Sequence, residues 1–324
     1  MTITALPPLG DFPLGDFPLG DFVHPAVFYA SDEEYLHLLV PFVVEGLEQG
    51  HPVAASVPAR QLRLLRDALG AAADDVLLLD MEVEGRNPGR IIPAVLRRFA
   101  DSHPGTHVRI IGEPIWAGRT DVEYPACAQH EALINLAFAG RDVTIACPYD
   151  TAALDEQVVT DALATHPEVW ETGGRRGSDR YAPDAVVSRY NQPFDIAPDA
   201  VALQVTTSAG IREARRFATG HADRLGLSGT RSADLALITT ELVANSFRHA
   251  GGSCLLSIWR DGTHLVCTAQ DSGHLADPLA GRRPAALDQD GGRGLLLINQ
   301  LADLVRVHTT PDGTTTHVFL RIAS

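Results

Sequence analysis

Three polar side chains in the last third of the chain recur at the spacing of one helical turn. They are Glu241, Asn245 and His249, and positions i, i+4 and i+8 share one face of a helix. An amide oxygen is a suitable ligand for Mg²⁺. A carboxylate one turn away can accept a proton from a hydroxyl or a water that attacks a phosphate. A polar stripe alone is more typical of a solvated helix face, so its meaning depends on the motifs that follow.

Two such motifs follow it. Asp271-Ser-Gly273 stands at the end of a predicted strand. An ionised aspartate can accept a hydrogen bond from an adenine amino group, and Gly273 lets the backbone approach a flat base closely. The run Gly291-Gly-Arg-Gly294 opens a predicted helix, where backbone N–H groups and the helix dipole favour a phosphate. Each motif is common by itself, and the order of the three is what is specific.

The apolar pattern around these motifs predicts the elements that must position them. Helices that lie on one face of a mostly antiparallel sheet make an α/β sandwich, with hairpins turning at Asp261-Gly262 and Asp312-Gly313. The expected strands are Val201–Thr206, Ser253–Trp259, Leu265–Asp271, Val305–Thr309 and Thr315–Ile322, and the expected helices are Ser208–Leu225, Ser232–His249 and Gly294–Ala302.

This series of motifs resembles the nucleotide site of the GHKL ATPase/kinase superfamily, and within it the anti-sigma factor serine kinases. The resemblance covers residues 201–324 and implies ATP and Mg²⁺ as cofactors. It implies that Asn245 holds Mg²⁺, that Glu241 is the general base and that Asp271 recognises adenine beside Gly273. The other expected cofactor-binding residues are His249, Gly292, Arg293 and Gly294. The motif at Asp271 lacks the family's second glycine, and the loop Ala276–Asp290 is short for a nucleotide lid.

Residues 24–193 alternate short apolar runs with helical segments, which predicts an α/β domain with a largely parallel sheet. The expected strands are Val53–Val57, Val76–Leu79, Val108–Ile111 and Val143–Ala146, and the expected helices are Glu33–Gln49, Ala59–Leu69, Ile91–Ala100 and Tyr124–Phe138. Residues 194–200 form the expected linker. Residues 1–23 repeat Leu-Gly-Asp-Phe three times, with Gly and Pro in a period that fits neither helix nor strand, so a disordered tail is expected there.

This first domain resembles the MEDS sensory domain in four segments. They are His24-Pro-Ala-Val-Phe-Tyr29, Gly112-Glu-Pro-Ile-Trp116, His130-Glu-Ala-Leu-Ile-Asn135 and Cys147-Pro-Tyr-Asp150. The resemblance implies a sensory role. Because ligands of open α/β sheets bind at the carboxyl ends of the strands, the candidate ligand residues are Glu113, Trp116, His130 and Tyr149, with structural turn and packing roles as the alternative.

Composition narrows the classes of function. The 324 residues carry 26 basic and 41 acidic side chains, and a net charge of −15 disfavours direct contact with nucleic acid. The four cysteines form no CxxC pair, which favours a reducing compartment and buried thiols. No run is apolar enough for a membrane span and no signal-peptide pattern begins the chain, so a cytoplasmic protein is expected. The histidine spacing predicts no structural metal site.

The function that these observations favour is regulation of a sigma factor. The chain would bind Mg-ATP and phosphorylate Ser or Thr of a STAS-type anti-anti-sigma partner, and would hold a sigma factor under control of the sensory domain. The family resemblance is compatible with a homodimer. Two alternatives stay open. One is a catalytically weak, ATP-responsive anti-sigma binding protein. The other is a histidine kinase-like sensor, for which His130 lacks the usual dimerising helical hairpin.

Overall fold

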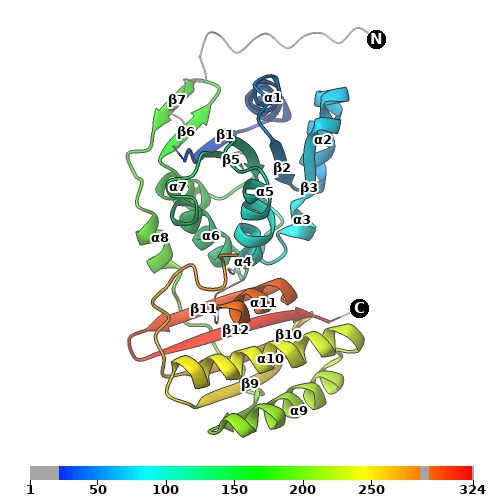
Figure 1. Cartoon of the computed structure of the whole chain (residues 1–324), viewed down its shortest axis with the longest axis vertical. Helices are drawn as coiled ribbons and strands as arrows, with labels where there is room; N and C mark the ends of the chain where they lie inside the picture. Colours follow the sequence, from blue (N-terminus) through cyan, green and yellow to red (C-terminus); the bar gives the residue numbers. More distant parts are fainter. Residues whose placement is uncertain (1–21, 285–291, 323–324) are drawn as a thin grey trace. The chain divides into compact units, whose positions relative to one another are not determined.

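Apolar runs bounded by Gly, Pro and Asp build two sheets, one in each of the two compact units of the chain (Figure 1). The structure is a computed structural model that describes residues 22–284 and 292–322. The first unit holds residues 22–85 and 95–188, and the second holds residues 86–94, 189–284 and 292–322. The repeats expected to form a tail lie outside the described residues up to position 21, as do Gly291 and residues 285–290 of the expected lid.

The sheet of the first unit has seven strands in the order β3-β2-β4-β5-β1-β6-β7. Every neighbouring pair is parallel except β6 and β7, which confirms the predicted α/β fold with a largely parallel sheet. The strands are β1 (Pro25–Tyr29), β2 (Val53–Val57), β3 (Val76–Asp80), β4 (Val108–Gly112), β5 (Val143–Asp150), β6 (Glu168–Glu171) and β7 (Gly174–Gly177). Strands buried on both faces read as continuous apolar runs, and β1, β2 and β4 are buried along their whole length.

Helices lie between or after these strands in the sequence. They are α1 (Asp32–Glu48), α2 (Ala59–Leu69), α3 (Met81–Glu84), α5 (Arg97–Asp101), α6 (Tyr124–Ala137), α7 (Glu156–Thr165) and α8 (Pro183–Arg189). At the start of α1 the Ser31 hydroxyl accepts a hydrogen bond from the Glu34 N–H, and the Glu34 carboxylate accepts one from the Ala30 N–H. These contacts satisfy backbone donors that the first turn of a helix leaves free.

The segment predicted as one helix over Ile91–Ala100 is helical but not regular. It consists of α4 (Pro88–Ile91), a π-helical stretch (Ile92–Leu96) and α5. Pro93 supplies the physical reason, because proline has no N–H for the helical ladder and its ring crowds the carbonyl four residues earlier. A wider π turn accommodates that crowding.

The sheet of the second unit has five strands in the order β11-β12-β10-β9-β8, and every neighbouring pair is antiparallel. The strands are β8 (Val201–Val205), β9 (Cys254–Asp261), β10 (His264–Asp271), β11 (Leu304–Thr310) and β12 (Gly313–Arg321). The helices are α9 (Ile211–Ala222), α10 (Gly229–His249) and α11 (Arg293–Leu301), with α4 also in this unit. Helices α9 and α10 lie together against this sheet (Figure 1), which confirms the predicted α/β sandwich.

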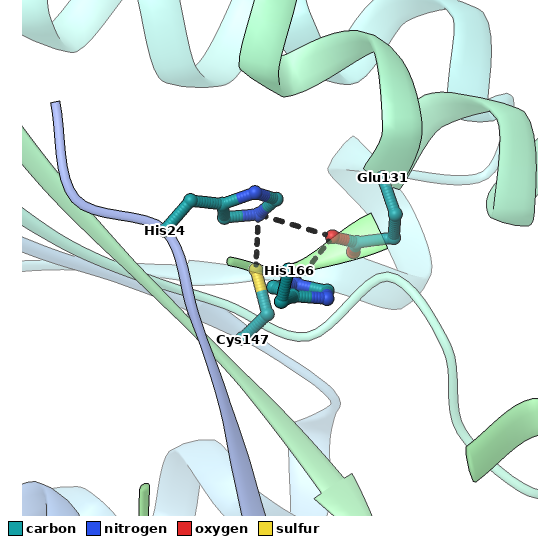
Figure 2. A group of neighbouring side chains, drawn as sticks. All are labelled: His24, Glu131, Cys147 and His166. Atoms are coloured by element: carbon teal, nitrogen blue, oxygen red, sulfur yellow. Dashed lines mark hydrogen bonds and ion pairs between the residues drawn. The ribbon is translucent and has the colours of Figure 1, made fainter. Parts of the chain in front are cut away.

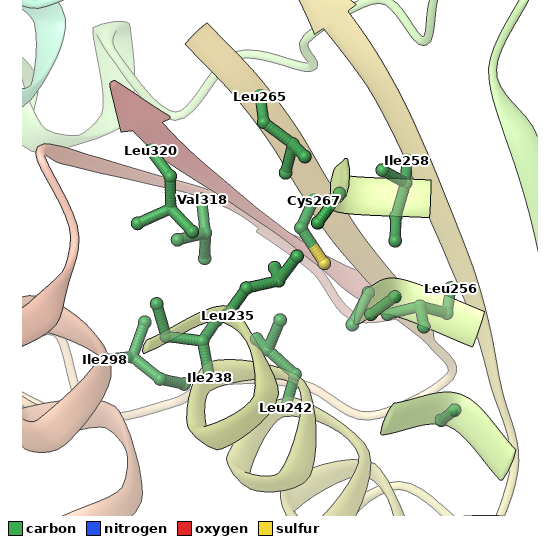
Figure 3. Close-up of a cluster of buried hydrophobic side chains, with 14 of the residues drawn as sticks. Leu235, Ile238, Leu242, Leu256, Ile258, Leu265, Cys267, Ile298, Val318 and Leu320 are labelled. Carbon is green, nitrogen blue, oxygen red and sulfur yellow. The ribbon is translucent and has the colours of Figure 1, made fainter. Parts of the chain in front are cut away.

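The core of the second unit forms where α10 meets the sheet. Leu235, Ile238 and Leu242 recur at i, i+3 and i+7 and point from α10 toward the strands (Figure 3). They meet apolar side chains of three strands and of α11, namely Leu256, Ile258, Leu265, Cys267, Val318, Leu320 and Ile298. Fully burying a Leu or Ile side chain stabilises the fold by about 1.5–3 kcal/mol. This packing fixes the rotation of α10 and therefore the direction of its polar stripe.

The described residues include no helix with both the length and the apolar character needed to cross a bilayer. Cys127, Cys147, Cys254 and Cys267 are all buried and are not in disulfides, as the sequence predicted.

Candidate functional site

The polar stripe of α10 meets the glycine run at the start of α11. Glu241 and Asn245 are half-buried, and their side-chain ends lie together over Gly294. A Cβ atom at Gly294 would lie 2.6 Å from Glu241 Oε2 and 3.2 Å from Asn245 Oδ1. Only a residue without a side chain fits there without displacing the carboxylate. The structure thus joins two of the motifs that the sequence singled out.

The amide of Asn245 is left without a partner. Its Nδ2 atom is buried and takes part in no hydrogen bond among the described residues. A buried polar group without a partner costs roughly 1–3 kcal/mol, so an incoming ligand that satisfies this amide recovers that cost. Because the two ends of an asparagine amide are assigned rather than seen, a half-turn presents its oxygen instead. The residue therefore fits the ligand of a hard cation.

The third motif lies against the same helix. Asp271, the last residue of β10, accepts a 2.6 Å hydrogen bond from the Ser246 hydroxyl and a 2.9 Å bond from the Gly273 N–H. A Cβ atom at Gly273 would lie 2.7 Å from Ala250 Cβ, so glycine is required for this close approach to the end of α10. Two donors hold the Asp271 carboxylate in place, and its remaining lone pairs are free to accept from a ligand.

A cavity of about 480 Å³ opens between these groups. Its polar lining includes Asn245, His249 and Asp271, while Leu242, Ala269, Leu279 and Leu295 supply apolar walls. Gly273, Gly292 and Gly294 also line it. A largely apolar pocket of this size with a few convergent polar groups is typical of small-molecule sites.

Glu241 and Arg293 line a neighbouring cavity of about 550 Å³. The two cavities share Gly294 and Pro284. The candidate base Glu241 therefore lines the second cavity, whereas Asp271 lines the first. At the start of α11, Gly292 has a φ of +78°, a left-handed conformation that favours glycine.

The described part of the expected lid packs on α11. Gly281 has a φ of +72°, and a Cβ atom there would lie 2.5 Å from Leu295 Cβ. Its carbonyl accepts a 3.0 Å hydrogen bond from Asn299 Nδ2. Asp277 and Arg283 form an exposed ion pair at 3.1 Å. Asp277, Gly281 and Arg283 line one side of the cavity of about 480 Å³.

The predicted site residues did not include Ser246 and Asn299. Both could have been predicted from the sequence, because each is a polar residue at a helical position whose neighbours face the core. Ser246 follows Leu242 by one turn, and Asn299 stands beside the buried Ile298.

Two of the sensory candidates are buried in different surroundings. Glu113 follows β4, and its Oε1 atom accepts a 3.2 Å hydrogen bond from the Tyr29 hydroxyl. Its Oε2 atom is buried without a hydrogen bond among the described residues, and burial raises the pKa of this carboxyl well above its usual value. Tyr149 instead meets Phe28 and His166 edge-on, and its buried hydroxyl has no partner among the described residues.

The other two candidates are His130 and Trp116. His130 is buried on α6, with 1% of its surface exposed. Trp116 is half-exposed, and the Arg119 guanidinium stacks 4.0 Å from its ring centre. Glu113, Tyr149 and Trp116 thus make contacts of different kinds: a hydrogen bond, edge-on ring contacts and a stacked guanidinium.

Two family models match the chain. Residues 23–167 match the MEDS model, described as the methanogen/methylotroph, DcmR sensory domain. Residues 205–320 match the histidine kinase-like ATPase domain. The chain thus joins a segment that matches the MEDS model to a segment that matches the histidine kinase-like ATPase model. More specifically, it combines an N-terminal MEDS domain with a C-terminal ATPase domain of GHKL type, as the motifs predicted.

Solved structures give only distant similarity. A Mycobacterium tuberculosis structure of RsbU and RsbW domains is 17% identical and covers 38% of this chain, with a TM-score of 0.29. The alignment spans 33% of that chain. The SiaB–SiaC complex of Pseudomonas aeruginosa gives 14% identity over 37% of this chain and 88% of its own, with a TM-score of 0.30. The Acinetobacter baumannii histidine kinase AdeS gives 9% identity over 63% and 98%, with a TM-score of 0.23. TM-scores this low support no inference about function. No curated protein matches the sequence.

Proposed function

We propose that this protein is an ATP-dependent switch that regulates a sigma factor. The ATPase domain binds Mg-ATP and transfers its terminal phosphoryl group to a Ser or Thr of a STAS-type anti-anti-sigma protein. It holds the sigma factor while that partner is phosphorylated, and the MEDS domain controls the balance. The observation that carries the proposal is the meeting of Glu241 and Asn245 over Gly294, beside the cavity that contains Asp271.

Each residue of the site has a separate role, which follows from its position. Asp271 accepts from the adenine amino group, and Gly273 lets the base approach the backbone. Asn245 binds Mg²⁺, which when bound neutralises charge on the phosphates. The start of α11 offers free backbone N–H groups to an anion. His249 and Arg293, at the rims of the two cavities, are the further candidates for phosphate contacts.

Glu241 is the residue that favours transfer over binding alone. A protein that only binds ATP has no use for a carboxylate one turn from the metal ligand. Glu241 faces the second cavity rather than the one that contains Asp271. A hydroxyl of a partner protein that enters the second cavity would meet this carboxylate, which can accept its proton.

The histidine kinase alternative receives no support from His130. A phosphoacceptor histidine must reach a nucleotide on another domain, whereas this side chain is buried inside an α/β unit. The catalytically weak alternative predicts the same ATP binding without transfer, so only an assay of transfer separates it from the proposal.

The test is incubation of the full-length chain with γ-labelled ATP and each STAS protein encoded in the same genome. We expect acid-stable label on one STAS protein, because Ser and Thr phosphates survive acid that hydrolyses a phosphohistidine. Asn245→Ala should abolish labelling, and Glu213→Gln, an exposed change on α9, should leave it intact. ATP binding without any transfer would favour the weak binder, and acid-labile label on the chain itself would favour a histidine kinase. Gel filtration with light scattering, with and without the sigma factor, tests the expected complex and the homodimer.

A further inference from the structure

Four side chains with metal-binding chemistry converge in the core of the first unit (Figure 2). His24 lies directly before β1, Glu131 on α6, Cys147 on β5 and His166 directly after α7. Each is at most 1% exposed. One ligand atom from each residue lies within 4.8 Å of the corresponding atoms of the other three.

The distances between these atoms fit a tetrahedral metal site. His24 Nε2 lies 3.3 Å from Glu131 Oε2 and 3.4 Å from Cys147 Sγ. His166 Nε2 lies 3.2 Å from the same Glu131 oxygen. In a tetrahedron with metal–ligand bonds of about 2.0–2.3 Å, ligand atoms are separated by about 3.3–3.8 Å. These three distances therefore need little adjustment for the four atoms to surround one ion.

The second nitrogen of each imidazole fixes which atom faces the cluster. Asn135 donates from its Nδ2 to backbone carbonyls, so its Oδ1 faces His24 Nδ1 at 3.1 Å and accepts from it. The Ala162 carbonyl, which can only accept, lies 2.8 Å from His166 Nδ1. Both rings therefore carry a proton on Nδ1, and a neutral ring then has a lone pair on Nε2. Histidine ligands of metals are oriented by an outer contact of this kind.

Those lone pairs face the Glu131 carboxylate. Neither Glu131 oxygen, nor His166 Nε2, has a hydrogen bond of good geometry among the described residues. Acceptors that face one another in a dry core are costly, and a bound cation between them would remove that cost.

We propose that His24, Glu131, Cys147 and His166 bind one divalent transition-metal ion in the MEDS domain. Imidazole and thiolate ligands select a first-row transition metal over Mg²⁺ or Ca²⁺, and Zn²⁺ accepts this mixed set in tetrahedral geometry. Binding converts the Cys147 thiol to a thiolate and releases its proton to solvent. Four protein ligands leave no open position for a substrate, which is typical of structural and regulatory sites.

The ion would join two strands to two helices of the sensory domain. Its loading would therefore determine whether β1, β5, α6 and α7 are held together. The sequence did not predict the site because its ligands follow no short spacing, and the sheet alone brings them together. The site lies in the first unit and is independent of the function proposed for the second.

The first test needs no variant. The full-length chain is purified without chelator, its metal content is measured by mass spectrometry, and the X-ray absorption fine structure is recorded at the zinc edge. We expect about one Zn²⁺ per chain, with one sulfur at about 2.3 Å and three nitrogen or oxygen atoms at about 2.0–2.1 Å. A folded chain that holds no metal, and takes up none when refolded with equimolar Zn²⁺, would overturn the proposal. So would bound zinc that has no sulfur ligand.

The second test assigns the ligands with a matched pair of cysteine variants. Cys127 is equally buried on α6 but is not part of the cluster. Chains refolded with Co²⁺ should show thiolate-to-cobalt charge-transfer absorption in the parent and in Cys127→Ser, and should lose it in Cys147→Ser. His166→Ala should weaken Co²⁺ binding by at least tenfold. Retention of the band in Cys147→Ser refutes this ligand set, and if that variant does not fold, the sulfur shell of the parent decides the question.

Discussion

Replacement of Asp271 by Asn tests adenine recognition with the smallest change of shape. The carboxylate accepts from the Ser246 hydroxyl through one oxygen and from the Gly273 N–H through the other. An asparagine keeps only one acceptor oxygen. The Gly273 N–H cannot turn away, so we expect the amide oxygen to face it and the new NH₂ group to face Ser246 and the cavity.

The size of the effect follows from what the cavity then presents. Adenine would meet an NH₂ donor where its own amino group donates, and the charge that strengthens the contact is gone. A hydrogen bond to a charged group contributes about 1.5–3 kcal/mol. Its loss corresponds to a rise of roughly 10- to 150-fold in the Kd for ATP. GTP, which has a carbonyl at that position, should lose nothing and gain a donor.

Isothermal titration of the full-length chain with ATP and with GTP in the presence of Mg²⁺ measures this effect. The parent should prefer ATP, and Asp271→Asn should lose or reverse the preference. Asp261→Asn, the same chemical change at an exposed position before the β9–β10 turn, is the control and should bind ATP like the parent. Equal affinity of the parent for the two nucleotides, or an Asp271→Asn variant within about twofold of the parent for ATP, would refute the assignment.

Three further predictions concern single residues. Asn245→Ala should lower Mg-ATP affinity by more than tenfold with little change in melting temperature, because the amide lacks a partner in the fold; an unchanged titration would contradict this. Gly294→Ala should displace the Glu241 carboxylate, which would lie 2.6 Å from the new Cβ. Because that side chain can move, the cost in stability should be about 1 kcal/mol, while single-turnover transfer falls; unchanged transfer would argue against the geometry. Burial lowers the pKa of His317 to about 4, so only the unfolded chain binds its proton between pH 6.5 and 4. The free energy of unfolding should therefore decrease as the pH is lowered from 6.5 to 4. At pH 5 it should be about 2 kcal/mol below its value at neutral pH. Denaturant unfolding of His317→Leu should lack this loss, and equal losses in both proteins would count against it.

Much of the fold could be predicted because a buried strand corresponds to a short, mostly apolar run in the sequence. Val53–Val57 and Val108–Ile111 are mostly apolar runs with one polar residue each, and both form strands of the parallel sheet. The central strand β1 was missed, since its five residues begin with a proline and follow a histidine. Residues 168–177 were also unassigned, because β6 and β7 are short and carry Glu, Arg and Gly. Such strands depend on tertiary pairing rather than on local pattern.

The two sites differ in how much of each could be predicted from the sequence. Glu241 and Asn245 are one turn apart, and the glycines of α11 belong to a motif, so their meeting over Gly294 could be predicted from order and spacing. Ser246 holds Asp271 through a contact that no motif describes. The cluster around Glu131 depends on which strands neighbour which, and the order β5-β1-β6 could not be read from the sequence.

The central claim is that Glu241 accepts the proton of a protein hydroxyl during phosphoryl transfer. The most direct measurement compares the parent and Glu241→Gln in single-turnover transfer from γ-labelled ATP to the STAS partner, with Mg-ATP affinity measured on the same samples. We expect affinities within about twofold and transfer that is about 10²–10⁴-fold slower in the variant. Equal transfer rates in the two proteins would contradict it.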